Sequence, residues 1–272
     1  MEISALTKWP KALADPSGSR ASKPRSAGLT MVIDKGLGLH SFAELLETAD
    51  EYIDIVKFGF GTSPLYKTPV LRSKIELAKR HGITVIPGGT LLEIAVSKDV
   101  VPAFFRQILT LGFDGIEVSD GTITLGRKDR DELIRDGSAL GLRVFTEYGK
   151  KLFGSRIDAE QFAETAERDL AAGAELVTVE ARESGVGVGL FDERGMCRQQ
   201  DLESMLRLIP FPSRIMWEAP QKEQQVALIK ALGSDVNLGN ILVNDVMALE
   251  TMRRGLRSDT FDHRLAYSDY MI

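Results

Sequence analysis

The sequence has few residues that bind soft metals or form cross-links: one cysteine, Cys197, and three histidines among 272 residues. A single cysteine excludes a disulfide within the chain and a cysteine-cluster metal site, and the shortage of both residue types argues against zinc. We therefore expect a reducing compartment, the cytoplasm. For Cys197 itself, an unreactive loop thiol is favoured over a catalytic one.

The sequence also lacks a basic excess and long apolar runs. It has 34 Lys and Arg against 39 Asp and Glu, a formal net charge of -5, which leaves no surplus to neutralise a nucleic acid or an anionic membrane. No apolar stretch reaches the roughly 18 residues of a membrane-spanning helix, and the N-terminus lacks the apolar centre of an export signal. We expect a small-molecule partner, with no nucleic acid and no membrane.

A central region with one repeated pattern lies between two irregular ends. Residues 1–28 mix Pro, Ser, Gly, Lys and Arg without periodicity, which predicts a tail or a strap over the domain, and residues 259–272 predict a second tail. Within residues 29–258, short β-branched runs alternate with longer segments whose apolar residues have helical spacing. The predicted strands are 30–35, 53–58, 83–87, 115–119, 142–147, 176–180, 214–218 and 235–238. The predicted helices are 42–49, 70–81, 101–111, 128–140, 158–172, 200–208, 222–232 and 245–254.

Glycines mark the joints between these helices and the strands that follow. They recur in "KRHGI", "LTLGFDGI", "SALGLRV", "LAAGAELV" and "KALGSDV", each just before a predicted strand, where glycine ends a helix. Eight strand–helix units favour a single (β/α)8 TIM barrel over a doubly wound sheet, which usually has a dinucleotide or phosphate fingerprint after its first strand. The predicted fold class is therefore α/β, with one barrel domain.

Charged residues stand at the C-terminal ends of most predicted strands, where barrel enzymes place their chemistry. These residues are Asp34, Lys35, Lys57, Glu117, Glu147, Glu180 and Glu218. Side chains alternate along a strand, so the valines of "LVTVE" and the Ile and Trp of "RIMWE" leave Glu180 and Glu218 facing the barrel interior. Glu117 has the same parity, and Glu147 is placed inward by analogy with its neighbours.

The glutamates together predict a metal site. Any one of them could simply pair with a lysine, but four carboxylates on strands about 5 Å apart repel one another unless they share a cation. Mg²⁺ is the simplest occupant because it takes oxygen ligands and keeps positions open for substrate. We assign Glu147, Glu180 and Glu218 as ligands, with Glu117 and Asp34 as further candidates.

Three loops beyond strand ends add candidate anion-binding groups. Gly88 and Gly89 of "PGGT", like the glycines of "KFGFGTS", would let backbone N–H groups approach an anion, although glycines in such loops also serve turns. The glycine-rich loop 180–195 carries Arg182 and could clamp an anion or close as a lid. Lys150 and Lys151 follow the fifth strand, where an ammonium group could reach a substrate carbon; a solvated basic loop is the alternative. No P-loop or complete G-x-G-x-x-G supports nucleotide binding.

Taken in order, these motifs closely resemble the phosphosulfolactate synthase family. The resemblance rests on "VIDKG", "VKFGFGTS", "PGGTLLE", "SDG", "TEYGKK", "EARESGVGVGLFD", "WEAPQKEQQV", "VNLGNI" and "LETMRRGLRSDTF", which span the chain apart from its two ends. It implies a (β/α)8 barrel that forms homotrimers. It also implies a carbon–sulfur lyase activity, the Mg²⁺-dependent addition of sulfite to phosphoenolpyruvate giving (2R)-phospho-3-sulfolactate, towards coenzyme M or sulfolactate.

The resemblance also implies roles for individual residues. The second lysine of "GKK", Lys151, corresponds to the family's proposed general acid. Lys35, Lys57 and Arg182, with Gly88, Gly89 and Lys150, are then the candidates for binding phosphate, carboxylate or sulfite, and no organic cofactor is required. Two alternatives remain: another lyase that works through a metal-stabilised enolate, and a non-catalytic barrel acting as a scaffold or stress protein. Lys151 and the ring of glutamates argue against the second.

Overall fold

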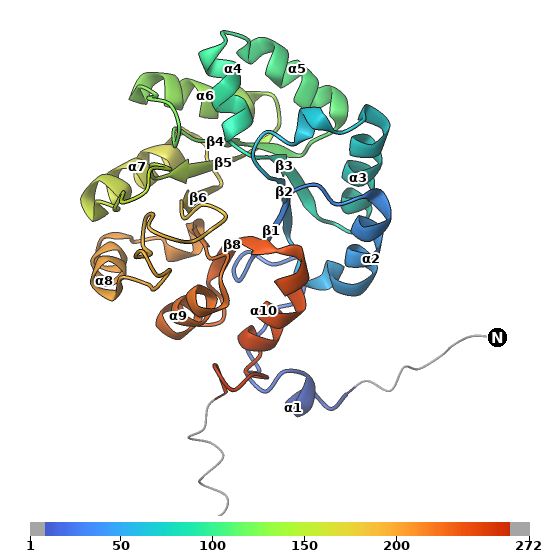
Figure 1. The fold of residues 1–272 in the computed structure, drawn as a ribbon, viewed down its shortest axis with the longest axis vertical. Helices are drawn as coiled ribbons and strands as arrows, with labels where there is room; N and C mark the ends of the chain where they lie inside the picture. Colours follow the sequence, from blue (N-terminus) through green and yellow to red (C-terminus); the bar gives the residue numbers. More distant parts are fainter. Residues whose placement is uncertain (1–8, 262–272) are drawn as a thin grey trace, which may run out of the picture.

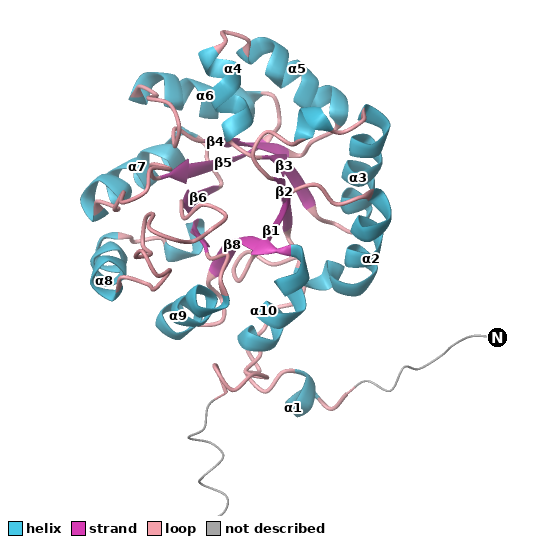
Figure 2. Cartoon of the chain, viewed as in Figure 1, coloured by secondary structure: helices cyan, strands magenta, loops and turns pink. Residues whose placement is uncertain are grey.

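Eight parallel strands surrounded by helices form the fold, as Figures 1 and 2 show. The computed structural model describes residues 9–261. The strands are β1 (Thr30–Asp34), β2 (Ile55–Phe58), β3 (Thr84–Pro87), β4 (Gly115–Val118), β5 (Arg143–Tyr148), β6 (Leu176–Val179), β7 (Ile215–Glu218) and β8 (Asn237–Leu242). They pair in the order β3-β2-β1-β8-β7-β6-β5-β4.

Asp114 closes the sheet into a barrel by joining β3 to β4. Its backbone N–H donates to the Val85 carbonyl at 3.0 Å, and its carboxylate accepts from the Val85 N–H at 2.9 Å. With this contact each strand has a neighbour on both sides, so the predicted (β/α)8 barrel is confirmed.

The outer layer consists of helices that follow the strands. They are α2 (Leu39–Ala49), α3 (Thr68–Arg80), α4 (Thr90–Ser97), α5 (Val101–Leu111), α6 (Arg127–Ala139), α7 (Ala159–Ala172), α8 (Gln199–Leu208), α9 (Lys222–Leu232) and α10 (Val246–Arg253). The short helix α1 (Lys11–Ala14) precedes β1 and lies outside this layer. Short 3₁₀ turns occupy Asp50–Tyr52, Ser63–Leu65, Pro212–Arg214 and Val243–Asp245. Gly112 and Gly173 end α5 and α7 with φ of 86° and 119°, the left-handed conformation expected at these joints. No helix within residues 9–261 is long and apolar enough to cross a membrane.

Two elements of the barrel differ most from the sequence-based prediction, and the short helix α1 lies within the predicted N-terminal tail. Helix α4 begins directly after Gly89, where the sequence predicted only an anion-binding loop. The two glycines favour a turn, and the helix that follows them is short, so it was not predicted. Strand β8 runs over Asn237–Leu242 instead of 235–238, because its polar and glycine residues weaken the strand pattern.

The barrel interior has an apolar lower part and a charged upper part. Seven buried side chains fill the lower part: Leu29, Met31, Ile55, Ile86, Phe145, Leu176 and Met216. A larger core lies between the strands and the helices. The charged residues at the C-terminal strand ends therefore stand on an apolar floor, where a charge without a partner is costly.

Residues 9–28 lie against the opposite, N-terminal end of the barrel. Arg25 pairs with Asp54 at 2.9 Å, just before β2, and the Lys23 ammonium donates to the Ile53 carbonyl at 2.8 Å. Arg20 pairs with Glu250 of α10 at 3.1 Å. The described part of the predicted N-terminal tail thus lies far from the glutamates, while residues 1–8 and 262–272 of the two predicted tails fall outside the described region.

Candidate active site

A cavity of about 400 Å³ opens at the C-terminal ends of the strands. Its walls are Ile33, Lys57, Phe60, Gly88, Gly89, Thr90, Glu117, Thr122, Glu147, Lys151, Glu180, Arg182, Glu183, Glu218 and Asn240. The four predicted glutamates all line it. A volume of this size suits a small metabolite.

A larger cavity, of about 740 Å³, lies at the other end, between the strap of residues 9–28 and the strand starts. Four of its charged side chains form ion pairs with one another: Arg25 with Asp54 and Arg143 with Glu175. The four predicted glutamates, with Lys57 and Lys151, line the cavity at the C-terminal end of the barrel.

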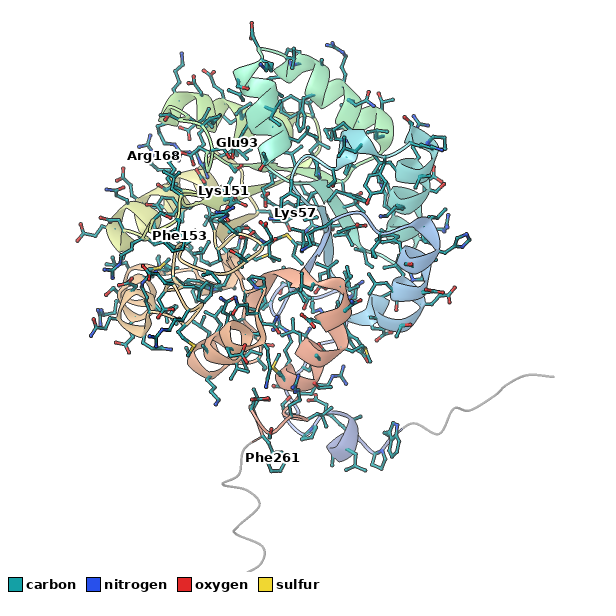
Figure 3. The ribbon with its side chains drawn as sticks, in the orientation of Figure 1. Lys57, Glu93, Lys151, Phe153, Arg168 and Phe261 are labelled. Atoms are coloured by element: carbon teal, nitrogen blue, oxygen red, sulfur yellow. The ribbon has the colours of Figure 1, made fainter. Side chains whose placement is uncertain are left out.

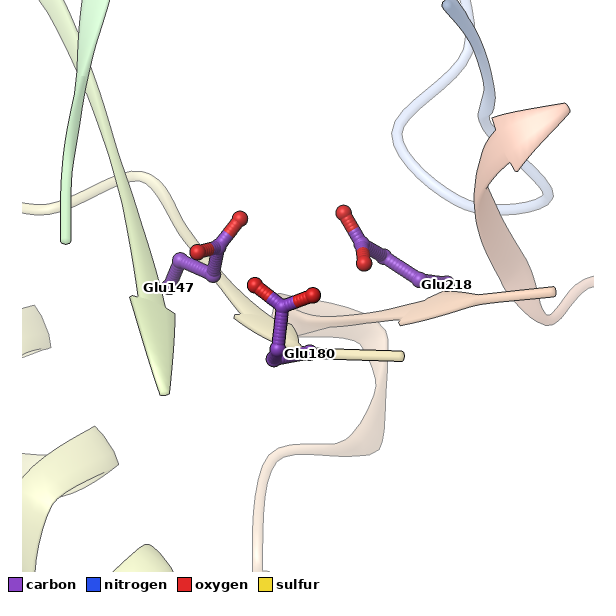
Figure 4. A group of neighbouring side chains, drawn as sticks. All are labelled: Glu147, Glu180 and Glu218. Carbon is purple, nitrogen blue, oxygen red and sulfur yellow. The ribbon is translucent and has the colours of Figure 1, made fainter. Parts of the chain in front are cut away.

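Strand geometry brings the glutamates together. Phe145 belongs to the apolar floor of the lumen, so Glu147, two residues later on β5, also faces inward. This settles the parity that the sequence left to analogy. Carboxylate oxygens of Glu147, Glu180 and Glu218 all lie within 4.8 Å of one another, and Figure 4 shows the three side chains converging. All three are at most 2% exposed.

Lys57, projecting from β2, neutralises part of this negative charge. Its ammonium lies 2.9 Å from Glu218 Oε1, 3.2 Å from Glu117 Oε1 and 3.6 Å from Glu147 Oε2. Burial alone would lower the pKa of Lys57, but the three carboxylates raise it well above its usual value. Lys57 is therefore a permanent cation that links β2 to the carboxylates of β4, β5 and β7.

Lys151 supplies the second ammonium. Its Nζ lies 2.7 Å from Glu147 Oε1 and 3.1 Å from Glu180 Oε2. Burial opposes the charge, but Glu147 and Glu180 raise the pKa of Lys151 well above its usual value, so the amine is protonated at neutral pH. Figure 3 shows Lys57 and Lys151 inside the ring of helices, in contrast to Arg168 on the outer helix α7.

The carboxylates divide into two kinds by pKa. Burial raises the pKa of Glu117 to about 7 against the opposing charge of Lys57, and burial with the neighbouring Glu147 and Glu218 raises the pKa of Glu180 well above its usual value. Burial would also raise the pKa of Glu147, but Lys151 and Lys57 hold it well below its usual range. Such a split is typical of neighbouring buried carboxylates that outnumber the cations beside them.

The N–H groups of Gly88 and Gly89 in "PGGT" were predicted to bind an anion, but both form hydrogen bonds within the protein. The Gly88 N–H donates to the Phe58 carbonyl and the Gly89 N–H to Glu117 Oε2, both at 2.8 Å, so neither is free for an anion. A Cβ at Gly89 would lie 2.4 Å from Ser119 Oγ, and one at Gly88 would lie 2.9 Å from the Phe60 nitrogen. Both glycines line the cavity because only they fit where β2, β3 and β4 come close.

Three charged residues named from the sequence lie away from the cavity walls. Asp34 faces out of the barrel, where Lys74 pairs with it and Tyr66 OH donates to it at 3.2 Å, so it does not join the glutamates. Its parity on β1 is that of Val32, which packs against the helices. Lys35 is exposed beyond the strand end. Lys150 donates to the Asp120 carboxylate at 2.8 Å and to the Ile123 carbonyl at 3.1 Å, outside the cavity.

Arg182 stands at the rim on the glycine-rich loop. Its backbone has φ of 61°, rare for a residue other than glycine, and its N–H donates to Glu180 Oε1 at 2.5 Å. Gln224 of α9 fastens the same loop by donating to the carbonyls of Gly185 at 2.6 Å and Gly195 at 3.0 Å. The loop is therefore held in place, with Arg182 facing the cavity.

Sequence reasoning missed two buried polar residues at this site. Glu93 of α4 accepts from Gly121 N–H at 3.1 Å and from Thr122 N–H at 2.9 Å, and thereby shapes the loop after β4. Asn240 of β8 lines the cavity directly. The helix that carries Glu93 was not predicted, and Asn240 lay beyond the predicted end of its strand.

Comparison with known proteins decides the family. Residues 18–259 match the family described as (2R)-phospho-3-sulfolactate synthase (ComA). The chain belongs to the phosphosulfolactate synthase family. It is 42% identical over 243 residues to the phosphosulfolactate synthase of Methanothermobacter thermautotrophicus, covering 89% of this chain and 94% of that protein. It is 42% identical over 244 residues to that of Bacillus subtilis, covering 89% and 95%.

Solved structures agree on the fold. The 3-hexulose-6-phosphate synthase of Salmonella typhimurium superposes with a TM-score of 0.52 at 14% identity, covering 83% of this chain and 99% of that one. At this identity the likeness concerns the barrel alone. Membership in the phosphosulfolactate synthase family makes the chain an enzyme, and confirms the resemblance seen in the motifs.

Proposed function

We propose that this protein catalyses the Mg²⁺-dependent addition of sulfite to C3 of phosphoenolpyruvate, giving (2R)-phospho-3-sulfolactate, with Lys151 protonating C2. Membership in the phosphosulfolactate synthase family supports the reaction as a whole. The observation that carries the proposal is the position of Lys151, a charged amine on the cavity wall in contact with Glu147 and Glu180.

The residues at the site fit a hard divalent cation. Glu147, Glu180 and Glu218 would hold it, because carboxylate oxygens of all three converge and Glu180 Oε2, apart from its ion pair with Lys151 at 3.1 Å, has no hydrogen bond within residues 9–261. With Glu117, Glu147, Glu180 and Glu218 all ionised, as a bound cation would favour, their four negative charges exceed the charges of Lys57 and Lys151 by two, which one Mg²⁺ would balance. When bound, the ion stabilises negative charge that develops on a substrate carboxylate.

The cationic side chains would make the encounter of two anions tolerable. Phosphoenolpyruvate and sulfite repel each other, and fixed positive charge in a partly desolvated cavity offsets that repulsion. Lys57 is already paired with Glu117 and Glu218, so it mainly limits the negative charge of the wall. Arg182 is exposed at the rim, and within residues 9–261 no ion pair ties up its guanidinium, which suits it to receive a substrate anion.

Lys151 would complete the addition. The sulfur lone pair of sulfite forms the bond to C3, the π electrons of the double bond move to C2, and the Lys151 ammonium transfers a proton to C2. Because Glu147 and Glu180 raise its pKa, the amine holds the proton that this step needs. Its methylene stem packs beside Gly121, where a Cβ would come within 3.0 Å of it, so the side chain has a fixed path into the cavity.

Consumption of phosphoenolpyruvate is the direct test. Purified protein with Mg²⁺ should consume it only when sulfite is present, a chelator should stop the reaction, and proton and carbon NMR should show a new C3–S bond. Turnover with water in place of sulfite would instead indicate a different enolate lyase. No turnover with any nucleophile would contradict the proposal.

The homotrimer and the cytoplasmic location stay predictions. Light scattering coupled to size-exclusion chromatography measures the mass of the assembly, which for a homotrimer is three times the chain mass of 29.9 kDa.

A further inference from the structure

Asn240 is held in a conformation that a regular strand would not give it. Its φ is 52°, in the left-handed region, where asparagine is the best tolerated residue after glycine but still pays a conformational cost. It sits at an irregularity in β8: Thr30 pairs with Leu238, but Val32 pairs with Ile241, so β8 has one residue more than β1 over this stretch. This is a β-bulge at the rim of the barrel.

The bulge changes where the Asn240 side chain points. Leu238 packs outward against the helices, and Gly239 faces the lumen, where a Cβ would lie 2.8 Å from Met31 Cε. Regular alternation would then turn Asn240 outward and Ile241 inward. Instead Ile241 belongs to the outer core and Asn240 lines the cavity, so two successive residues face inward.

Within residues 9–261, the oxygen of the side chain that the bulge turns inward has no hydrogen-bond partner. Asn240 is 4% exposed, and its Oδ1 is buried without a hydrogen bond. A turn of about 180° about the Cβ–Cγ bond exchanges oxygen and nitrogen with little change of shape, and would leave the N–H group unpaired instead. In neither orientation does a residue within 9–261 pair with the amide, so a ligand in the cavity that Asn240 lines can supply a partner, and a buried unpaired polar group is costly.

From this combination of a bulge, backbone strain and an unpaired buried amide, we propose that Asn240 is a substrate-binding residue whose side-chain amide hydrogen-bonds to phosphoenolpyruvate. This assignment rests on the proposed function. An amide N–H can donate to anionic oxygen without adding charge to a wall that already holds five glutamates, two lysines and an arginine. Phosphoenolpyruvate, with carboxylate, bridging and phosphate oxygens, offers more acceptors than sulfite. Strain maintained at a single residue is typical of a binding site.

Substitutions at Asn240 separate binding from folding. Asn240→Gly removes the amide and suits the positive φ, so we expect an unchanged or higher Tm together with a KM for phosphoenolpyruvate raised by about tenfold or more. Asn240→Ala removes the same amide but fits the backbone less well, so its Tm should fall while its KM rises as in the glycine variant. Asn240→Asp keeps the shape but adds negative charge, and should raise the KM further.

Asn237 provides a matched control on the same strand. It lies at the other end of β8, where its amide accepts from Leu29 N–H at 2.9 Å and donates to the Ser213 and Ile215 carbonyls at 2.8 and 3.0 Å. Asn237→Ala should lower the Tm and leave the KM unchanged.

The outcomes distinguish the two proposals. If the unmodified enzyme turns over but Asn240→Gly keeps its KM for phosphoenolpyruvate within about twofold, or changes only the KM for sulfite, the role of Asn240 is overturned and the proposed function stands. If the unmodified enzyme does not consume phosphoenolpyruvate with sulfite, the proposed function itself fails.

Discussion

The Lys151 ammonium lies 2.7 Å from Glu147 Oε1, four residues earlier in the chain, although no helix joins the two residues. Strand β5 ends at Tyr148, and Gly149 follows with φ of 130°, which turns the chain back over the barrel mouth. A Cβ at Gly149 would lie 2.9 Å from the Glu180 Cβ, so glycine also allows the loop to pass close to β6. The turn sends two adjacent lysines to different places: Lys151 to the cavity and Lys150 to Asp120.

These different positions predict that substitution of Lys151 impairs catalysis and that substitution of Lys150 does not. Lys151→Ala should lower kcat by between about a hundredfold and ten-thousandfold, the usual contribution of a general acid. Lys150→Ala should stay within about threefold of the unmodified enzyme, because its amine binds loop atoms outside the cavity. Sulfite-dependent loss of phosphoenolpyruvate measures both. Equal losses in the two variants would contradict the division of roles.

The proposed metal site predicts that Mg²⁺ stabilises the protein in the absence of substrate. At about 100 times its Kd the ion should add roughly 2.7 kcal/mol to the free energy of unfolding, seen as a rise in Tm. Glu180→Gln should reduce that rise, because it removes one of three converging carboxylates. Glu175→Gln, which alters a carboxylate at the other end of the barrel, is the control. A Tm insensitive to Mg²⁺ would argue against the site.

A buried ion-pair network on α6 and α7 contacts the backbone of Glu147. Asp169 of α7 is fully buried; it accepts a hydrogen bond from Arg130 Nη2 at 2.6 Å and forms an ion pair with Arg127 at 2.7 Å. Arg130 in turn donates to the Glu147 carbonyl at 3.1 Å. Asp169→Asn leaves two arginines without their shared countercharge, and should lower the free energy of unfolding by about 3–5 kcal/mol. Urea denaturation measures this loss.

The control for Asp169 is an exposed pair on the same helix. Glu164 lies 3.5 Å from Arg168, with side chains 70% and 49% exposed. Because solvent screens such pairs, Glu164→Gln should change the free energy of unfolding by about 0.5 kcal/mol or less. A similar loss in both variants would contradict the importance given to burial.

Cys197 should react slowly with thiol reagents. Burial, with the charge of Asp201, raises the pKa of the thiol to about 11, so at pH 8 only about one molecule in a thousand carries the reactive thiolate. Because the pKa is raised, the fraction of thiolate should keep increasing about tenfold per pH unit well above pH 8. Alkylation by iodoacetamide should be at least about tenfold slower in the folded protein than in urea, and should leave turnover intact. Rapid inactivation would assign the thiol a role in the site.

The barrel and the carboxylate ring could both be predicted from the sequence, because each depends on local periodicity. Apolar alternation of period two marks the strands, glycines end α5 and α7, and the parity of "LVTVE" and "RIMWE" places Glu180 and Glu218 inward. The predicted barrel also places the glutamates together, because the parallel strands of a closed barrel have all their C-terminal ends on one side.

Only the tertiary structure decided which charged residues share the cavity and which hydrogen bonds they make. Asp34 and Lys150 stand beside strand ends as Lys57 and Lys151 do, but packing against Lys74 and Asp120 takes them elsewhere. Gly88 and Gly89 look like anion-binding glycines, yet their N–H groups bond to Phe58 and Glu117. Asn240 lines the cavity only because of a bulge in β8. The bulge depends on the pairing of β8 with β1 and leaves no periodic signal in the sequence. Such contacts join residues far apart in the chain, and local propensity does not encode them.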